Sequence, residues 1–232
     1  MRKFLMFLII ILVILAGCVC YLGFTDNDMG ISIPLMNTAD DNGDASEEAA
    51  TVDFKDVTTE DWFYDYVNFV VGNGIMTGVA EDEFAPYSSM TRAMIAQMLY
   101  SMAGAPETQS VGYMDVAEDA WYINAVDWVS LNNIMSSDDA YFRPEDQITR
   151  EELAVALMNY AEFNDIDCST DADISTFNDA NTVNADAVDA MKWAIGTGVM
   201  GGNEGNVIEP QKSATRAEIA TIMTNFCEKF AA

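Results

Sequence analysis

The apolar residues of this chain follow two different patterns. Near its start, Phe4 to Phe24 form an uninterrupted apolar run of 21 residues. From residue 54 onwards, apolar residues instead recur every three or four positions, as at Leu153, Leu157 and Tyr160, which places them on one face of a helix. We therefore predict an apolar N-terminal helix followed by an all-α body built from amphipathic helices.

The apolar run has the length and the flanks of an export element. A helix of this length spans roughly 30 Å, about the hydrocarbon thickness of a bilayer. Arg2 and Lys3 precede it, and a positive flank keeps the start of a chain in the cytoplasm while the remainder moves outward. We therefore interpret residues 1–24 as a signal or anchor segment and expect the protein at the cell envelope.

Three kinds of export element fit these residues. Residues 15–18 read Leu-Ala-Gly-Cys and resemble a bacterial lipobox, in which the cysteine is lipidated and becomes the new N-terminus. On that interpretation Cys18 is the lipidation site. Residues 19–24 remain apolar, which favours an uncleaved membrane anchor instead. A cleaved signal peptide is the third alternative, and all three export the rest of the chain.

A polar, acidic segment follows at residues 25–53. Five of its acidic residues are clustered between Asp40 and Glu48. Such a composition cannot bury a core, so we predict a flexible linker, with a root-mean-square reach of roughly 30 Å at this length. The linker would hold the following domain clear of the membrane.

Residues 54–232 contain three copies of one unit. In each copy a proline stands six residues before an arginine, and a threonine directly precedes that arginine. The phrases are Pro86 with Thr91 and Arg92, Pro144 with Thr149 and Arg150, and Pro210 with Thr215 and Arg216. We place the copies at residues 54–106, 113–165 and 177–232. Because one such unit buries too little apolar surface to stand alone, we expect the three to share a core.

Each copy is predicted to fold as helix, loop, helix. The first helix ends at a glycine-type stop. The stops are Gly74, Asn133 and Gly198. The second helix begins at the threonine, which forms a capping box with a glutamate three residues later in two copies. The pairs are Thr149 with Glu152 and Thr215 with Glu218. In the first copy Met94 occupies the glutamate position, so its box is incomplete.

The composition limits the range of functions. The net charge is −28, and beyond Arg2 and Lys3 only eight basic residues face 38 acidic ones, which argues against nucleic acid as a partner and against binding to anionic membrane surfaces. The chain has no histidine, so Ser-His and Cys-His nucleophilic sites are excluded. The cysteines have no zinc-type spacing, and a Cys168–Cys227 disulfide is left open. We predict no catalysis, no cofactor and no metal.

The ordered motifs of the copies resemble the S-layer homology domain, in three tandem repeats covering residues 54–232. The motifs are aromatic-x-Asp, a Trp-Tyr-type pair, Gly-Ile/Val-Met, Phe-x-Pro and Thr-Arg-x-Glu. The resemblance implies a pseudo-threefold α-helical spindle that binds cell-wall polysaccharide non-covalently, often a pyruvylated secondary cell-wall polysaccharide. The chain departs from the pattern at Met94, at Asn133 and Ser137, and in copy three, which lacks the Trp-Tyr pair.

The repeated arginines are the first candidates for ligand binding. Each falls at the first position of its helix, where a cation is disfavoured by roughly 0.3–1 kcal/mol, so helix formation does not explain them. An internal ion pair with an aspartate is one explanation. The other is a guanidinium held open for a carboxylate on an incoming sugar, and the two are compatible. The ion-pair explanation predicts that removing an arginine destabilises the fold. The ligand explanation predicts that removing it mainly weakens binding. The arginines are Arg92, Arg150 and Arg216, and aspartates lie 36, 35 and 37 residues before them, at Asp56, Asp115 and Asp179.

Two tryptophans complete the candidate site. Trp62 and Trp121 stand at a predicted helix start, where a partly exposed indole would either stack on a sugar or seal the contact between copies. Trp128 and Trp193 are predicted to be core residues. Each binding groove is expected between neighbouring copies and to combine an arginine, an aspartate and an aromatic residue. The Arg150 site is expected to be the strongest, because copy two retains both the Trp-Tyr pair and the capping glutamate.

These observations predict an exported, non-catalytic protein that attaches to cell-wall polysaccharide or peptidoglycan. Two alternatives stay open. The negative charge repels an anionic polymer at long range, which favours a cationic wall component such as amine-decorated peptidoglycan. The acidic faces would otherwise dock a basic partner, making the chain a protein-interaction or assembly module at the cell surface. The oligomeric state is not predicted.

Overall fold

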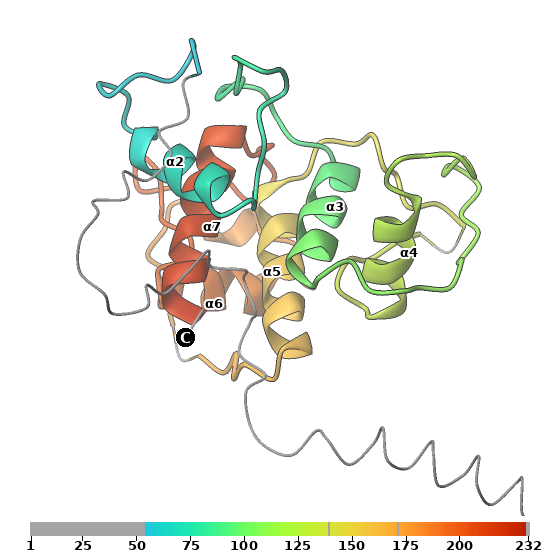
Figure 1. Cartoon of the computed structure of the whole chain (residues 1–232). Coiled ribbons are helices and arrows are strands. Elements are labelled where there is room, and N and C mark those ends of the chain that lie inside the picture. The colour runs from blue at the N-terminus through green and yellow to red at the C-terminus, as the bar shows by residue number, and fades with distance from the viewer. Residues whose placement is uncertain (1–53, 139, 171, 231–232) are drawn as a thin grey trace, which may run out of the picture.

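The described part of the protein is all-α, as predicted. A computed structural model describes residues 54–138, 140–170 and 172–230, which form six α-helices and one short 3-10 helix (Figure 1). The helices are α2 (Tyr64–Gly72), α3 (Arg92–Met102), α4 (Ile123–Leu131), α5 (Arg150–Phe163), η1 (Ala180–Thr182), α6 (Val188–Thr197) and α7 (Arg216–Phe230). Extended pairing within these residues is confined to isolated bridges.

Three predictions concern residues outside this part of the chain. They are the apolar helix of residues 4–24, the lipidation of Cys18 and the acidic linker. Among the residues that the structure does describe, no helix combines the length and the apolar character needed to cross a bilayer.

Helix packing joins different copies rather than the two helices of one copy. The second helix of a copy packs against the first helix of the next, so that α3 contacts α4 and α5 contacts α6. The same arrangement runs from the last copy back to the first, because α7 lies against α2 (Figure 1). Every copy therefore depends on both of the others for its packing.

A ring of three backbone hydrogen bonds also joins the copies. The N–H of Met90 donates to the carbonyl of Ala214 at 3.4 Å, and the N–H of Ala214 donates to the carbonyl of Ile148 at 3.2 Å. The N–H of Ile148 returns to the carbonyl of Met90 at 3.0 Å. Each of these residues lies two positions before the arginine of its copy. The ring thereby sets the relative positions of the three N-termini of α3, α5 and α7.

The second helices begin as the sequence predicts. Thr149 accepts a hydrogen bond from the N–H of Glu152, and the Glu152 carboxylate accepts one from the N–H of Thr149, which completes the capping box of α5. The same two bonds form at the start of α7. At α3 only half of the box exists: Thr91 accepts from the N–H of Met94 at 3.3 Å, and methionine offers no carboxylate in return.

The predicted stops of the first helices are confirmed as well. Gly74, Asn133 and Gly198 follow α2, α4 and α6 with φ angles of 67°, 55° and 80°. This left-handed conformation ends a helix and is easily adopted by glycine and, among other residues, by asparagine. Copy two thus keeps the stop although it lacks the glycine.

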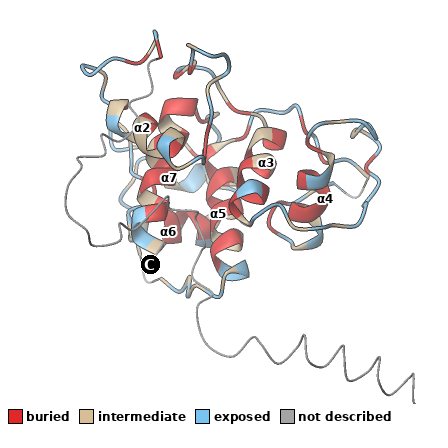
Figure 2. Ribbon diagram, viewed as in Figure 1, coloured by how far each residue is buried: buried red, intermediate tan, exposed pale blue. Residues whose placement is uncertain are grey.

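The second helices each contribute more buried residues than any of the first helices. Eight residues of α3, eight of α5 and nine of α7 are buried, against two of α2 (Figure 2). Trp128 and Trp193 belong to this core, as predicted. The arginines that begin α3, α5 and α7 therefore stand at the ends of the three most deeply packed helices.

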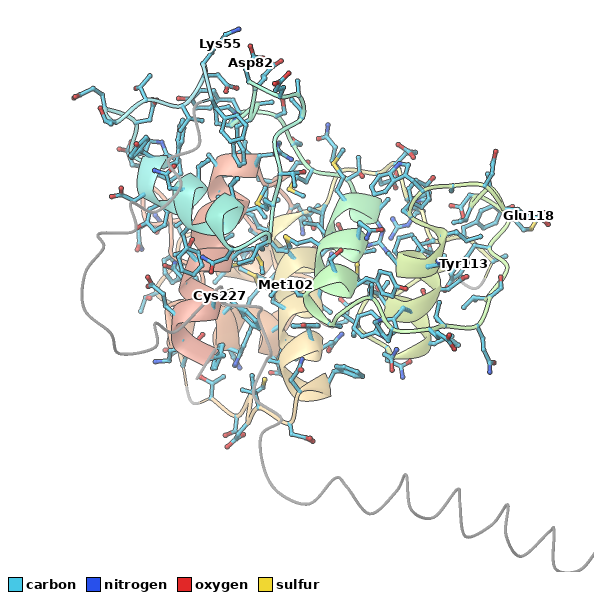
Figure 3. The ribbon with its side chains drawn as sticks, in the orientation of Figure 1. Lys55, Asp82, Met102, Tyr113, Glu118 and Cys227 are labelled. Atoms are coloured by element: carbon cyan, nitrogen blue, oxygen red, sulfur yellow. The ribbon has the colours of Figure 1, made fainter. Side chains whose placement is uncertain are left out.

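Both described cysteines are free thiols, so the disulfide that the sequence left open is not formed. Burial raises the pKa of Cys227 to about 12 and that of Cys168 to about 11, which keeps both thiols protonated and unreactive at neutral pH. Cys227 and Met102 lie among the helices, whereas Lys55 and Asp82, which precede and follow α2, lie together at the outside of the protein (Figure 3).

Candidate functional site

The side chain of each repeated arginine enters the loop of the next copy. In every case Nε donates to one main-chain carbonyl, at 2.6–3.0 Å, and Nη2 donates to a second. The acceptors are Phe142 and Ser136 for Arg92, Ile208 and Gly201 for Arg150, and Phe84 and Thr77 for Arg216. Because the third arginine reaches back to copy one, the three insertions form a closed cycle. They tie each second helix to the neighbouring loop.

All three arginines are buried in these positions. Their exposed fractions are 1% for Arg92, 3% for Arg150 and 7% for Arg216. Burial lowers the pKa of each guanidinium from its usual value, yet an arginine remains charged at neutral pH. Cation–π contacts stabilise two of these charges: the ring centroid of Phe142 lies 4.9 Å from the Arg92 guanidinium carbon, and that of Phe84 lies 4.4 Å from the Arg216 guanidinium carbon. The guanidinium that was expected to be open to a ligand is thus partly occupied. Nε and Nη2 are bound to main-chain carbonyls, and Nη1 is the nitrogen that these carbonyls leave free.

The three aspartates bind the same loops at main-chain N–H groups. Asp115 accepts the N–H groups of Phe142 and Arg143 at 3.0 and 2.7 Å. Asp56 and Asp179 accept the equivalent pairs in their own copies. The second donor of each pair has a φ of 48° to 60° although it is not glycine. Such a backbone costs about 1–3 kcal/mol, which the two charge-assisted bonds offset.

The expected ion pair between arginine and aspartate is replaced by an indirect connection. In copy two, Asp115 binds the N–H of Phe142 while Arg92 binds its carbonyl. No direct pair of a repeated arginine with Asp56, Asp115 or Asp179 occurs in the part of the chain that the structure covers. The aspartate and the arginine therefore bind the same residue of the loop, one at its N–H and the other at its carbonyl.

The two candidate tryptophans are exposed, as the sequence analysis expected. The exposed fraction is 59% for Trp62 and 63% for Trp121. Each packs edge-on against the aromatic residue that follows it, with ring centroids 5.3 and 5.0 Å apart. More than half of the surface of each tryptophan is thus exposed to solvent.

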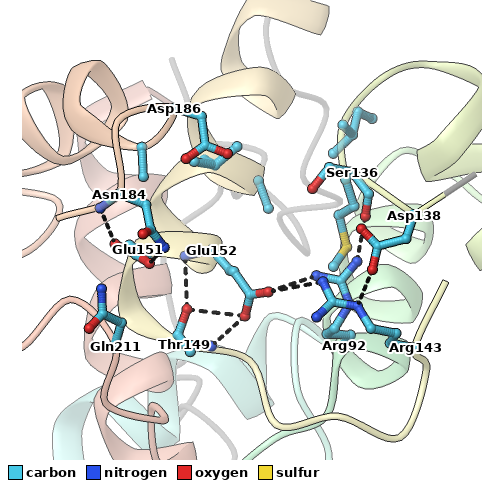
Figure 4. Close-up of a pocket in the computed structure, with 15 residues that line it drawn as sticks. Arg92, Ser136, Asp138, Arg143, Thr149, Glu151, Glu152, Asn184, Asp186 and Gln211 are labelled. Carbon is cyan, nitrogen blue, oxygen red and sulfur yellow. Dashed lines mark hydrogen bonds and ion pairs between the residues drawn. The ribbon is translucent and has the colours of Figure 1, made fainter. Parts of the chain in front are cut away.

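One cavity of about 370 Å³ is built from all three copies (Figure 4). Arg92 comes from copy one, Glu152 and Arg143 from copy two, and Asp186 from copy three. The Oε1 atom of Glu152 lies 3.2 Å from Nη1 of Arg92 and 3.7 Å from the Arg143 guanidinium. In this cavity Nη1, the nitrogen of the repeated arginine that the main-chain carbonyls do not bind, is already bound by a carboxylate of the protein.

A second cavity, of about 420 Å³, has the same construction, with copy one in the place that copy two takes in the first cavity. Arg216 comes from copy three, the first turns of α3 and the loop at residues 74–79 come from copy one, and Trp121 comes from copy two. An arginine and an exposed tryptophan thus meet in one cavity. The repeated aspartates line neither cavity, so only the arginine and the aromatic residue of the expected groove are brought together here.

The structure changes which residues belong to one site. Trp121 and Arg150 lie in the same copy, yet Trp121 lines the cavity of Arg216. The reason for expecting the Arg150 site to be the strongest, that copy two retains both features, therefore does not apply to one cavity, and the order of the three sites stays a prediction. Sequence analysis also treated Glu152 and Met94 only as capping residues, although both line the cavities. The sequence feature that could have identified these residues is the replacement of the glutamate by Met94 in copy one.

Comparisons with known proteins agree with this organisation. The family model described as the S-layer homology domain matches three segments, residues 53–94, 112–154 and 176–220. The chain is 30% identical over 166 residues to the Surface-layer 125 kDa protein of Lysinibacillus sphaericus, covering 70% of this chain and 14% of that protein.

Enzymes and other surface proteins share the same region. The chain is 28% identical over 180 residues to Exoglucanase XynX of Acetivibrio thermocellus, covering 77% of this chain and 16% of the exoglucanase. It is 26% identical over 185 residues to an S-layer protein of Bacillus thuringiensis subsp. finitimus, covering 78% and 22%. The chain thus spans less than a quarter of the length of each of these relatives.

Proposed function

Because the chain belongs to the S-layer homology domain family, whose modules anchor proteins to the cell wall, we propose that it attaches non-covalently to wall polysaccharide through the cavities between its copies. The protein is exported, associated with the wall and non-catalytic in this proposal. The glycosidase names among its relatives are not transferred to it, because the chain covers only a small share of those enzymes.

One observation carries the proposal: an arginine and an exposed indole meet in a cavity large enough for a sugar. The cavity of Arg216 measures about 420 Å³, and Trp121 at its edge is 63% exposed. An indole stacks on the apolar face of a sugar ring, and a guanidinium donates to a carboxylate. The ligand class that fits is therefore an acidic saccharide, such as a carboxylate-bearing secondary wall polymer.

The pseudo-threefold spindle forms part of the same proposal. The closed ring of backbone hydrogen bonds and the cyclic insertion of the three arginines support it. A symmetric arrangement would present several sugar sites on one rigid body, so a polymer with repeated units would gain affinity through effective concentration.

Sedimentation with purified cell walls tests this function. The full-length chain, in mild detergent, is expected to sediment with walls of the bacterium that produces it. Walls extracted with acid, which removes secondary polymers, are expected to retain at least tenfold less protein. The physical reason is that peptidoglycan alone lacks the acidic saccharide that fits the cavity.

Two results would change the conclusion. Equal sedimentation with extracted walls would assign binding to peptidoglycan, including the amine-bearing form that the negative charge of the chain favours. An absence of sedimentation with any wall preparation would contradict wall binding and leave the protein-interaction module as the better explanation. An unrelated acidic protein of similar charge serves as the control for non-specific retention.

The anchoring of the N-terminal segment is a separate prediction. If residues 15–18 act as a lipobox, Cys18→Ser is expected to abolish metabolic labelling with fatty acid and to leave the precursor at its full mass. Cys20→Ser, in the same apolar run, serves as the control and should label normally. If Cys18→Ser changes nothing and mass spectrometry finds the intact N-terminus, the segment is an uncleaved anchor.

A further inference from the structure

The third position of each second helix faces the arginine of the preceding copy. In copy two this residue is Glu152, whose Oε1 lies 3.2 Å from Nη1 of Arg92. In copy three it is Glu218, the carboxylate with the largest charge effect on Arg150. Glu152 thus has a second role besides capping, because it neutralises the guanidinium that copy one brings to the cavity, whereas the ion pair that Glu218 forms is with Lys212, at 3.5 Å.

Copy one lacks this carboxylate. Its equivalent residue is Met94, which lines the cavity of Arg216. Asp56 is the one carboxylate of the described residues whose charge raises the pKa of Arg216, and both oxygens of Asp56 already accept backbone N–H groups, at 2.9 and 2.6 Å. Glutamate charges act on Arg92 and Arg150, whereas within the described residues none acts on Arg216 and none lines its cavity.

The remaining donor of Arg216 is open to a ligand. Its Nε and Nη2 atoms are bound to the carbonyls of Phe84 and Thr77. Nη1 has no hydrogen-bond partner within the described residues, and it is not among the polar atoms sealed from solvent there. The residue is nonetheless buried, with an exposed fraction of 7%. A buried guanidinium that lines a cavity and has an unpartnered nitrogen is well placed to bind an anion, because low local solvation strengthens the charge-assisted bond.

The walls of this cavity are apolar, in contrast to the rest of the acidic chain. Four methionines and Trp121 contribute to them, and Arg216 is the only charged residue that the described part of the chain supplies. The methionines are Met76, Met90, Met94 and Met98. Flexible thioether side chains adapt to an irregular apolar group. The cavity therefore suits a carboxylate that is carried next to a methyl or other apolar group.

From these observations we infer that the Arg216 cavity is the carboxylate-binding site of this chain, and that Met94 is the residue that makes it so. This inference rests on the proposed wall binding and assigns it to one cavity. In the Arg92 cavity an incoming carboxylate must displace Glu152, whereas in the Arg216 cavity it meets an uncompensated cation. The three copies are thus unequal, and the unequal residue is a specificity determinant.

Substitution of Met94 by glutamate tests this inference. Met94→Glu completes the capping box with Thr91, whose hydroxyl already accepts the N–H of residue 94, and it places a carboxylate beside Arg216. The melting temperature is expected to stay the same or to rise. Sedimentation of the full-length chain with intact walls is expected to fall at least tenfold. A change that preserves the fold and removes binding cannot be attributed to unfolding.

Two variants serve as matched controls. Met94→Leu keeps an apolar side chain at the position and should bind within threefold of the unmodified chain. Gln109→Glu adds the same charge on an exposed segment outside the cavity and should also bind within threefold, which separates the local effect from the total charge. Walls whose carboxylates have been reduced to alcohols should retain at least tenfold less of the unmodified chain.

The outcomes separate this inference from the general function. If the unmodified chain sediments with walls but Met94→Glu sediments equally well, the Arg216 cavity is not the site and the inference is overturned. Undiminished binding to carboxyl-reduced walls would also overturn it, since the ligand would then not be a carboxylate. If the unmodified chain fails to sediment, the proposed wall binding itself is contradicted.

Discussion

A chain that ends at Asn164, before copy three, is expected to lose cooperative folding altogether. The truncation removes α6 and α7, which are the packing partners of α5 and α2. It also removes both carbonyl acceptors of Arg150 and breaks the ring of backbone hydrogen bonds at Ala214. Two helix pairs and a buried cation would lose their partners at once, and a chain of two copies buries too little surface to compensate.

Circular dichroism and calorimetry of the truncated and full chains would measure this effect. The full chain is expected to unfold in one transition, whereas the truncated chain should show no sharp transition between 20 and 90 °C. A cooperative transition in the truncated chain, within about ten degrees of the full-length value, would show that two copies form an independent unit. The cyclic packing would then be less important for folding than the contacts indicate.

Replacement of Arg150 by alanine is expected to lower the free energy of unfolding by about 3–6 kcal/mol, because two hydrogen bonds from a charged group to main-chain carbonyls are lost, at about 1.5–3 kcal/mol each. The two carbonyls are those of Ile208 and Gly201, each 2.8 Å from the guanidinium. For a domain of this size the loss corresponds to roughly 2–4 °C in melting temperature per kcal/mol. Chemical denaturation with urea gives the free energy directly.

Arg143 provides the matched control within the same chain. Its side chain is 41% exposed and its ion pairs lie at the surface, so Arg143→Ala should change the free energy of unfolding by less than about 1 kcal/mol. If Arg150→Ala proved as mild as Arg143→Ala, the buried guanidinium would contribute little to the fold. The arginines would then be retained for ligand binding alone.

The connection between the arginines and the loops also affects how binding is measured. A simple arginine-to-alanine variant removes a donor for the ligand and a structural bond at the same time, so a loss of wall binding by such a variant has two explanations. Met94→Glu avoids this difficulty, because it changes the cavity without removing any hydrogen bond that the structure contains.

Local features of the fold could be predicted from the sequence. The capping boxes of α5 and α7, the half box at Thr91 and the left-handed stop at Asn133 all form as predicted. Each of these features depends on residues within a few positions of one another, so the chemistry of the side chains decides the local backbone. The burial of Trp193 follows from the helical spacing of apolar residues in the same way.

The order of the motifs also determined the repeat count and the family resemblance, and it identified the arginines and Trp121 as candidate site residues. It could not determine which copies meet at a site. The sequence places Trp121 with Arg150, whereas the structure places it with Arg216. The repeated motif predicts the structure of each unit. It does not show which unit packs against which when the three close into a ring.

The roles of the charged residues were decided only by the tertiary structure. Sequence spacing relates Asp115 to the arginine of its own copy, Arg150, while the folded chain connects it through Phe142 to Arg92 of the preceding copy. Glu152 and Met94 occupy the same local position and both start a helix. Their difference matters only because packing brings a buried guanidinium from another copy against that position, where a carboxylate neutralises the cation and a methionine leaves it free.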